Sequence, residues 1–509
     1  MMIKTLRQAV FLRLTLFLVF GIIIQTQRDS FPYWIYIAVF SLPVLSLSMF
    51  PKIIKSYSLR WLFGVGLFLL CSSSAGILTY SKWKQSDWSE EVGIKNYLIQ
   101  LIDEPVRKPQ TWMCKARTGN KIVLVYIQAD STSSSLRPSD WLSVKARFEK
   151  TGQLNYLKQN IAARAFVSAN NWEKLESFPK QNFNLRYYSL KCRRTLINQL
   201  KKVLPDEKSF AVAAAVSFGY ALEIDRETRQ TFAATGTAHI LAVSGLHFAI
   251  IYSMLNFLFS FLGNSRRERI VKQSIILPLL WIYAFLTGMP PSVTRAVIMI
   301  TLWGAGSAFQ FRALTINTLG SAAFFMLLYN PYNLYDIGFQ LSFTAVFAIL
   351  LINPYLTSLY HSRNPMIRYV WELSCTSTSA QLGTAPLSMY YFHQFPLLYL
   401  VSNIFAIPVM GIILMLIPLS LLISVFFGNL PELLFPLQKL LQVFIGYLSV
   451  LAEIPNSVVT DIQLSVKDAV MLASGIIFLF MFIMKKRLIY LCLLIIFAVL
   501  QVFYYLCSR

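Results

Sequence analysis

The stretch WLFGVGLFLLCSSSAGILTY, residues 61–80, runs without a single charged side chain. At ~1.5 Å per residue, a helix of this length matches the ~30 Å hydrocarbon core of a bilayer. Similar apolar runs lie near residues 11–25 and 33–49, and about ten more follow residue 208 when runs of roughly 17–25 residues are counted. The sequence therefore predicts a polytopic α-helical membrane protein with about 13 spans.

The overall composition agrees with this prediction. Of the 509 residues, 56% are hydrophobic and only 14% are charged, whereas about 25% charged is usual for a soluble domain. Two stretches leave the number of crossings open. Residues 210–220 are too short to cross and could be re-entrant or interfacial, whereas residues 401–427 could form one tilted helix or a broken one.

Short loops rich in lysine and arginine predict the orientation, because such loops stay in the cytoplasm. They occur in five places: Lys4 and Arg7; Lys52, Lys55 and Arg60; Arg266, Arg267, Arg269 and Lys272; Arg363 and Arg368; and residues 485–487. This arrangement predicts a cytoplasmic N-terminus and places residues 81–208 outside the cytoplasm. The C-terminus would also be external on about 13 crossings, but one crossing more or fewer would reverse it.

Residues 81–208 interrupt the apolar pattern and are long enough to fold as a domain. Short alternating runs predict strands at residues 96–102, 111–118, 121–128, 140–148 and 161–167, which favours a small β-barrel of the OB kind. A basic helix is expected at residues 185–203. The predicted domains are thus N-terminal transmembrane helices (1–80), this external OB-like basic domain with its connecting helix (81–208), a transmembrane core (209–430) and C-terminal transmembrane helices (431–509).

The external domain is strongly basic. It holds 23 lysine and arginine residues against 12 aspartate and glutamate residues, an excess of 11 within a net charge of +23. Cations that follow phosphates, together with aromatic rings that stack on bases, suit single-stranded nucleic acid. The candidate contacts are Lys191, Arg193, Arg194, Lys201, Lys202, Trp112 and Trp141. Alternatively, the rings belong to the barrel core or the membrane interface, and the charges form a solvated face.

Two cysteines, Cys114 and Cys192, lie in the same external segment. An oxidising compartment would permit them to pair as a disulfide. Their spacing does not show whether the geometry fits, so a bridge and two free thiols both remain open.

The segment HILAVSGLH, residues 239–247, places polar groups within apolar sequence. Such groups at membrane depth usually face a wet pathway. On one continuous helix His239 and His247 would be about 80° apart and could line one passage. Ser244 and Gly245 would let a neighbouring backbone come close. The alternative is tight packing with satisfied histidines.

Other polar residues recur near the ends of apolar runs. Arg295 follows Pro290 and Pro291, where the helix dipole disfavours a cation, so a buried carboxylate or a polyanionic substrate is expected to compensate it, unless it snorkels to head groups. Asp336 and Gln340 could share a helix face, or Asp336 could cap the helix. The remaining candidates are Ser342, Gln381 and Asn403.

Several of these stretches resemble the ComEC-type competence proteins. The resemblance rests on residues 232–247 (FAATGTAHILAVSGLH), Leu286 to Gly288, Ser292 to Ala296, Asn330-Pro331, residues 336–343 (DIGFQLSF), residues 381–387 (QLGTAPL) and Asn403 to Pro408. In the external segment, Asp103 to Pro105 and residues 154–161 add to it. Many members carry a metallo-β-lactamase-like domain after the last spans; this chain is expected to be a short form without it.

The resemblance implies a channel of the bacterial plasma membrane that admits one strand of transforming DNA. It further implies an external DNA receptor and a cytoplasmic ATP-dependent helicase or translocase as partners, besides membrane lipid. The sequence has no phosphate-binding loop and no clustered metal ligands, so neither an enzyme activity nor a cofactor is expected. The pore would then be lined by the polar residues named above.

Two alternatives are kept. A transporter of another anionic polymer or a lipid-linked substrate would need the same basic entrance and polar pathway. An intramembrane protease would use Ser244 as its nucleophile, but His247, three residues further along, is not expected to accept the serine proton.

Overall fold

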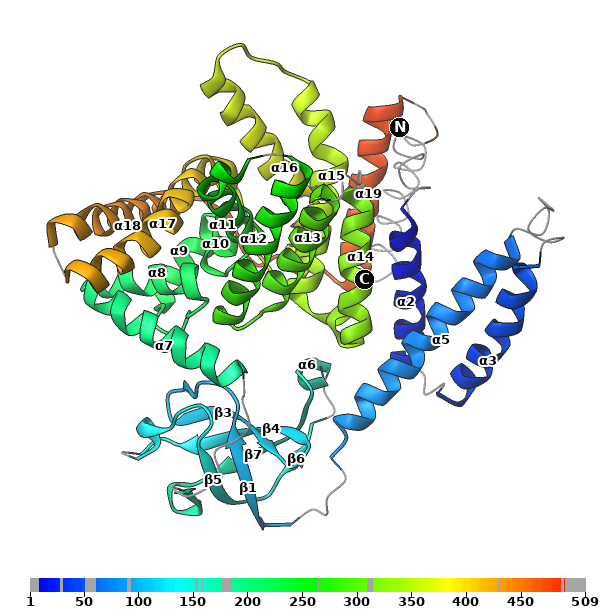
Figure 1. Ribbon diagram of the computed structural model, residues 1–509, viewed down its shortest axis with the longest axis horizontal. Helices are drawn as coiled ribbons and strands as arrows, with labels where there is room; N and C mark the ends of the chain where they lie inside the picture. The colour runs from blue at the N-terminus through cyan, green and yellow to red at the C-terminus, as the bar shows by residue number, and fades with distance from the viewer. Residues whose placement is uncertain are drawn as a thin grey trace. The chain divides into compact units, whose positions relative to one another are not determined.

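The computed structural model describes residues 9–27, 31–50, 61–88, 93–130, 132–151, 154–157, 159–175, 185–263, 265–308, 315–428, 431–486 and 489. These residues form two compact units (Figure 1). The N-terminal unit comprises residues 3–195 and 320–336. The C-terminal unit comprises residues 196–319 and 337–509, with residues 1–2.

Three long helices belong to the N-terminal unit: α2 (Val10–Gln27), α3 (Phe31–Ser48) and α5 (Trp61–Gln85), with α5 packed against the other two. A Cβ added at Gly21 would overlap the backbone of Ser72, so α2 and α5 touch backbone to backbone. The second half of α14 (Thr315–Tyr329) also packs on α2. There the Thr15 hydroxyl donates to the Gly320 carbonyl at 2.8 Å.

The sheet domain of the same unit contains all five expected strands, each within two residues of its predicted ends. Its strands are β1 (Lys95–Leu101), β2 (Val106–Arg107), β3 (Thr111–Thr118), β4 (Lys121–Gln128), β5 (Trp141–Ala146), β6 (Glu149–Lys150), β7 (Ile161–Val167) and β8 (Trp172–Leu175). They pair in the order β6-β7-β4-β3-β1-β5-β8, with β2 beside β3. Every pairing is antiparallel except that between β4 and β7.

The predicted closed barrel is wrong. The strand order ends at β6 on one side and at β8 on the other, and no pairing among the described strands joins these two ends or joins β5 to β7, so the sheet does not close. Inward-facing side chains such as Ile99, Val125 and Leu142 form a continuous hydrophobic core. The OB assignment itself stays a prediction.

Of the two alternatives left open for Cys114 and Cys192, the structure has two free thiols. Cys114 is fully buried in the core of the sheet, whereas Cys192 is exposed on α7 (Leu185–Val203). Burial raises the pKa of the Cys114 thiol to about 12, because the thiolate would lose its hydration. A thiol held inside the sheet cannot meet an exposed one without opening the core.

In the C-terminal unit, one hydrophobic cluster joins α8 (Glu207–Phe218), α9 (Arg226–Ala234), α10 (Ala238–Leu241), α17 (Tyr399–Phe427) and α18 (Pro431–Glu453). Phe232 and Phe444 meet edge to face at its centre. The Asp206 carboxylate caps α8 by accepting the Ser209 N–H at 2.9 Å. Since α8 is almost entirely buried and only ~18 Å long at ~1.5 Å per residue, the expectation that this stretch does not cross is supported.

A second cluster joins α11 (Gly245–Leu258), α12 (Arg266–Leu286) and α13 (Pro291–Ala308), with Phe248 and Leu280 fully buried. The helices α15 (Ile337–Ser358) and α16 (Pro365–Phe392) form a hairpin, and α19 (Val466–Lys485) packs against α16. A Cβ at Gly383 would collide with Ala348, so glycine is needed for the close approach of α15 and α16. After them, β9 (Phe395–Pro396) pairs with β10 (Val458–Val459).

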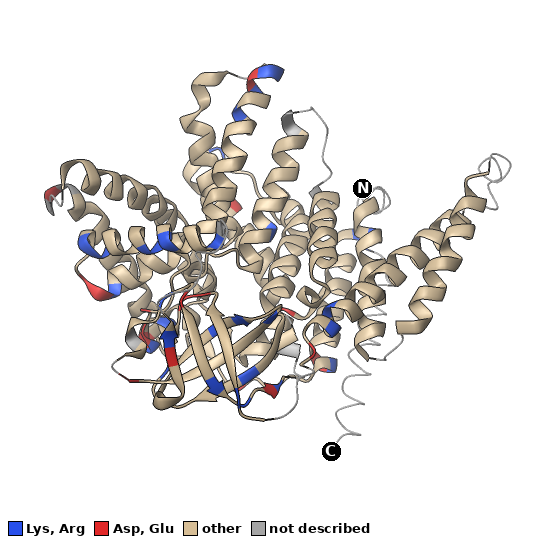
Figure 2. Ribbon diagram, turned by 60° about the horizontal axis from the view of Figure 1, so that its bottom comes forward, with Lys and Arg blue, Asp and Glu red and all other residues tan. Residues whose placement is uncertain are grey.

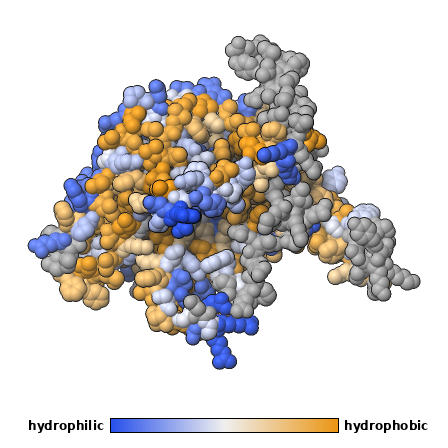
Figure 3. All heavy atoms as spheres, turned by 90° about the horizontal axis from the view of Figure 1, so that it is seen from above, coloured by the Kyte–Doolittle hydropathy of each residue, from blue (hydrophilic) through white to orange (hydrophobic). Residues whose placement is uncertain are grey.

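Within the described residues, eight helices are long and apolar enough to span a bilayer: α2, α3, α5, α12, α15, α17, most of α18, and α19. The residues 401–427 lie on one continuous helix, α17. Two apolar runs counted among the expected spans form shorter helices, Gly245–Leu258 and Ile316–Tyr329. Most helical turns carry no charge (Figure 2), and one face shows broad hydrophobic areas (Figure 3). The chain is therefore a multi-pass membrane protein.

Candidate functional site

The histidine-containing motif is broken between two helices. His239 lies on α10, His247 lies on α11, and the intervening Ala242 and Ser244 have extended backbones. The predicted single helix with both rings about 80° apart is therefore wrong. The helix α10 ends at Leu241, and Ser244 occupies the N-cap position from which the next helix, α11, begins.

Ser244 and His247 hold the start of α11 together. The Ser244 backbone N–H donates to His247 Nδ1 at 3.2 Å, and the Ser244 Oγ lies 2.9 Å from the same nitrogen. The two side chains are therefore within hydrogen-bond distance of each other. However, Nδ1 is already an acceptor for the backbone N–H, and no carboxylate orients the ring in the part of the chain that the structure describes. This is helix capping rather than an activated nucleophile.

A tight turn before α10 accounts for the polar residues at positions 235–237, which directly precede the histidine-containing motif. Thr235 and Thr237 are fully buried and their hydroxyls lie 2.8 Å apart. Gly236 between them has φ +75°, and a Cβ there would come within 2.9 Å of Tyr399. Only glycine fits this position without strain, so the T-G-T triplet sets the chain direction into α10.

Gly245 does not have the predicted close-packing role. A Cβ added there would meet only the Ala296 Cβ, at 3.8 Å, which is ordinary van der Waals contact. The approach of α11 and α13 is instead fixed by the Ser292 hydroxyl, which donates to the Val243 carbonyl at 2.8 Å.

Arg295 is the most unusual residue of the unit. Its side chain on α13 is only 3% exposed, and the guanidinium lies 5.4 Å from the ring centre of Phe343 on α15. It donates from Nη2 to the Ser292 carbonyl at 3.4 Å, while Nη1 is buried without an acceptor. No carboxylate forms an ion pair with it among the described residues. Since the head is enclosed by protein, snorkelling does not account for it.

Two further residues that were predicted to line the pore have a buried polar atom without a hydrogen-bond partner among the described residues. These atoms are His247 Nε2 on α11 and Asn403 Oδ1 on α17. The helix α11 packs against both α13 and α17. Buried polar groups are normally satisfied, and a few exceptions on adjoining helices indicate water or a ligand.

The other predicted pore residues are more dispersed. Gln340 on α15 accepts a hydrogen bond from the Tyr391 hydroxyl of α16 at 2.9 Å. Ser342 and Gln381 are half-buried on α15 and α16, and His239 is exposed with Nδ1 3.1 Å from the Gly236 carbonyl. Asp336 belongs to the N-terminal unit and directly precedes α15. It thus shares no helix face with Gln340, which favours the cap alternative.

The predicted pore does not coincide with either of the two pockets described below. Of the two best-formed pockets among the described residues, the larger lies between α15 and α16, and the smaller lies near Lys208 and Phe232. Neither is lined by a predicted pore residue. A continuous wet pathway therefore stays a prediction.

The predicted cationic contacts differ in availability. On α7, which was predicted with its exact bounds, Lys191, Arg194, Lys201 and Lys202 are exposed. Arg193 is instead mostly buried, and its guanidinium pairs with Glu104 at 3.1 Å. Lys201 also lies 5.5 Å from the ring centre of Phe210. Arg193 is therefore better explained as holding α7 to the sheet domain than as a ligand contact.

The two tryptophans predicted to contact nucleic acid are less exposed than expected. Trp112 packs against the sheet core, as the alternative interpretation expected, and Trp141 is half-buried on β5. An aromatic pair that was not predicted lies on the outer face of the sheet. Tyr126 and Phe166 are register partners on β4 and β7, stacked at 4.9 Å with an interplanar angle of 16°, and Phe166 is 63% exposed. Arg164 lies on the same face, two residues before Phe166.

Comparison with known proteins places these features in a family. Residues 216–486 match the sequence profile of the Competence protein family. ComE operon protein 3 of Bacillus subtilis is 31% identical over 225 residues, which is 44% of this chain and 28% of that protein. Recombination protein 2 of Haemophilus influenzae is 26% identical over 245 residues, 45% of this chain and 30% of that protein.

An uncharacterised protein of Aquifex aeolicus is 30% identical over 298 residues, which cover 57% of this chain and 65% of that protein. The matched stretches thus span less than two thirds of each of these relatives. No solved structure matches the chain significantly. The family profile covers more than half of the sequence, including α11, α13, α15, α16 and α17. The chain belongs to the Competence protein family.

Proposed function

We propose that this chain forms a channel of the bacterial plasma membrane for uptake of transforming DNA as a single strand. The family match supports a role in competence-related DNA uptake. The observation that supports an anionic substrate is Arg295, a buried cation on α13 without a carboxylate partner among the described residues. Burying a charge without an opposite partner is costly in any protein interior, so this arginine is expected to serve a function.

In this mechanism the basic sheet domain and the exposed cations of α7 lie outside the cytoplasm and collect the strand electrostatically. Tyr126 and Phe166 stack on its bases. Arg295 then meets successive phosphates, while His247 and Asn403 hydrogen-bond to water or to the moving strand. Work must come from a cytoplasmic ATP-dependent helicase or translocase, and capture from an external DNA receptor.

The direct test is to score cytoplasmic entry of labelled DNA in a strain that lacks the gene. We expect entry to be abolished and to return when the full chain is supplied. Undiminished DNA entry, together with loss of export of an anionic polymer or a lipid-linked substrate, would instead favour the alternative transporter. Labelling the two complementary strands with different labels distinguishes single-strand uptake from uptake of the duplex.

The proposed orientation makes a prediction for the two thiols of the external segment. In a variant that retains only Cys192, a membrane-impermeant maleimide added to intact spheroplasts should label the protein, because this thiol is exposed. A variant retaining only Cys114 should stay unlabelled until it is denatured, because burial raises the pKa of that thiol to about 12. Labelling of Cys192 only after lysis would place the domain in the cytoplasm.

A further inference from the structure

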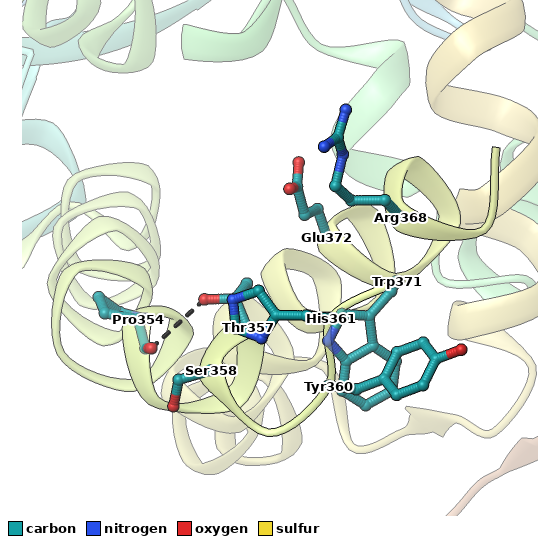
Figure 4. A pocket seen from close by; sticks show the side chains of 8 residues that line it. All are labelled: Pro354, Thr357, Ser358, Tyr360, His361, Arg368, Trp371 and Glu372. Atoms are coloured by element: carbon teal, nitrogen blue, oxygen red, sulfur yellow. Dashed lines mark hydrogen bonds between the residues drawn. The ribbon is translucent and has the colours of Figure 1, made fainter. Parts of the chain in front are cut away.

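The larger pocket lies at the turn of the α15–α16 hairpin, far along α15 from Gln340 and Ser342. It has a volume of about 310 Å³ and is formed by the last turns of α15, the start of α16 and the connection between them. Its lining residues are Pro354, Thr357, Ser358, Tyr360, His361, Arg368, Trp371 and Glu372 (Figure 4). The proposed function gives this pocket no role.

Three polar side chains that line the pocket have interactions to spare for a ligand. Arg368 and Glu372 lie one turn apart on α16 and extend to the same side (Figure 4). Neither forms an ion pair with any described residue, although their charges are opposite. Trp371 Nε1 is buried without an acceptor in the described structure. The pocket therefore offers a cation, an anion and a donor, all available to a ligand.

Several apolar side chains that neighbour the lining residues in sequence are exposed. Leu359, Met366, Ile367 and Tyr369 have exposed fractions of 59%, 74%, 48% and 52%. The helix α15 is a candidate span that ends at Ser358, directly before this group. Charged groups in a pocket at the end of a span, with exposed apolar residues close by in sequence, are typical of the boundary between head groups and acyl chains.

We propose that this pocket binds the head group of a phospholipid that carries both a phosphate and a primary ammonium, the ethanolamine class. The phosphate accepts hydrogen bonds from the Arg368 guanidinium and the Trp371 indole. The ammonium pairs with Glu372 and lies against the ring of Tyr360. The exposed apolar side chains then contact the acyl chains.

Two observations favour this ligand over its competitors. Glu372 would repel a purely anionic head group or a DNA phosphate, but it complements an ammonium. The exposed apolar side chains next to the lining residues would gain nothing from a nucleic acid, whereas acyl chains would cover them. The volume lies at the low end of small-ligand pockets, and it suits a head group rather than a folded partner.

The test uses the full chain in detergent, titrated with dioleoyl lipids and observed by native mass spectrometry. We expect phosphatidylethanolamine to bind about tenfold more tightly than phosphatidylglycerol, which corresponds to one charge-assisted contact. Glu372→Gln should remove this preference by weakening the ethanolamine lipid alone. Arg368→Gln should weaken both lipids. Arg363→Gln, in the same connection but outside the pocket lining, is the matched control and should change neither.

Arg363, Arg368 and Glu372 are all exposed, so their variants are expected to insert normally. Trp371→Phe provides an independent variant that removes the N–H donor and keeps an aromatic ring, and it should weaken both lipids. Free phosphoethanolamine in excess should compete if the head group alone is recognised, and should not compete if acyl chains are needed. Equal affinity for the two lipids, or equal effects of Glu372→Gln and Arg363→Gln, would overturn the proposal. Arg368-dependent binding of an oligothymidylate in place of lipid would also overturn it.

Discussion

Replacing Arg295 with glutamine is expected to lower DNA uptake by about 10- to 100-fold while the protein still inserts in normal amounts. A hydrogen bond to a charged group contributes about 1.5–3 kcal/mol, and every 1.4 kcal/mol corresponds to a factor of ten. A strand that passes Arg295 would lose this contact at every phosphate. Lysine would keep the charge but not the planar, forked donor group, so Arg295→Lys should give an intermediate level.

The stability of the same variant separates a functional role from a structural one. A buried cation without a carboxylate partner destabilises the folded state, so its removal should leave thermal stability unchanged or higher. Lys272 offers a matched control, because it is another cation of this unit that is only 5% exposed. Lys272→Gln should insert and support uptake at close to the normal level. A well-inserted Arg295→Gln protein with normal uptake would contradict the proposed role.

The sequence predicts those helices and strands that a local pattern of residues determines. Apolar runs locate many of the helices, alternation locates the five long strands of the sheet domain, and the basic stretch at residues 185–203 was correctly predicted as the helix α7. The strands β6 and β8 escape this approach, because two to four residues are too few to show alternation. They are nevertheless the strands at the two ends of the open sheet.

The candidate site shows the same division. Arg295 could be predicted, since an arginine in an apolar helix is unusual in any fold. The break before α11 could not, because Ser244 lies inside an apolar run and its capping role depends on His247 three residues later. The pairing of Arg193 with Glu104 joins residues 89 positions apart, which no local pattern reports. Phe166 did leave a signal, because it occupies an outward position between the buried Ala165 and Val167.

That outward position leads to the second prediction of large effect. Phe166→Ala in the full chain should weaken binding of a fluorescent oligothymidylate by about 10–100-fold, because base stacking on an aromatic ring is worth about 1–3 kcal/mol per base. Tyr126→Ala should have a similar effect. The double variant should lose less than the sum of both free energies, since the two rings stack on each other at 4.9 Å.

The salt dependence of the same binding reaction shows whether Tyr126 and Phe166 act by stacking. The slope of log K against log salt reports how many phosphates are neutralised, so Phe166→Ala should lower the affinity and leave the slope unchanged. Arg164→Gln, on the same face, should reduce the slope by about one phosphate contact. Leu98→Ala is the control, because Leu98 is also exposed (47%) but belongs to β1. If Phe166→Ala and Leu98→Ala bind equally well, the strand is held by charge alone and the aromatic pair has another role.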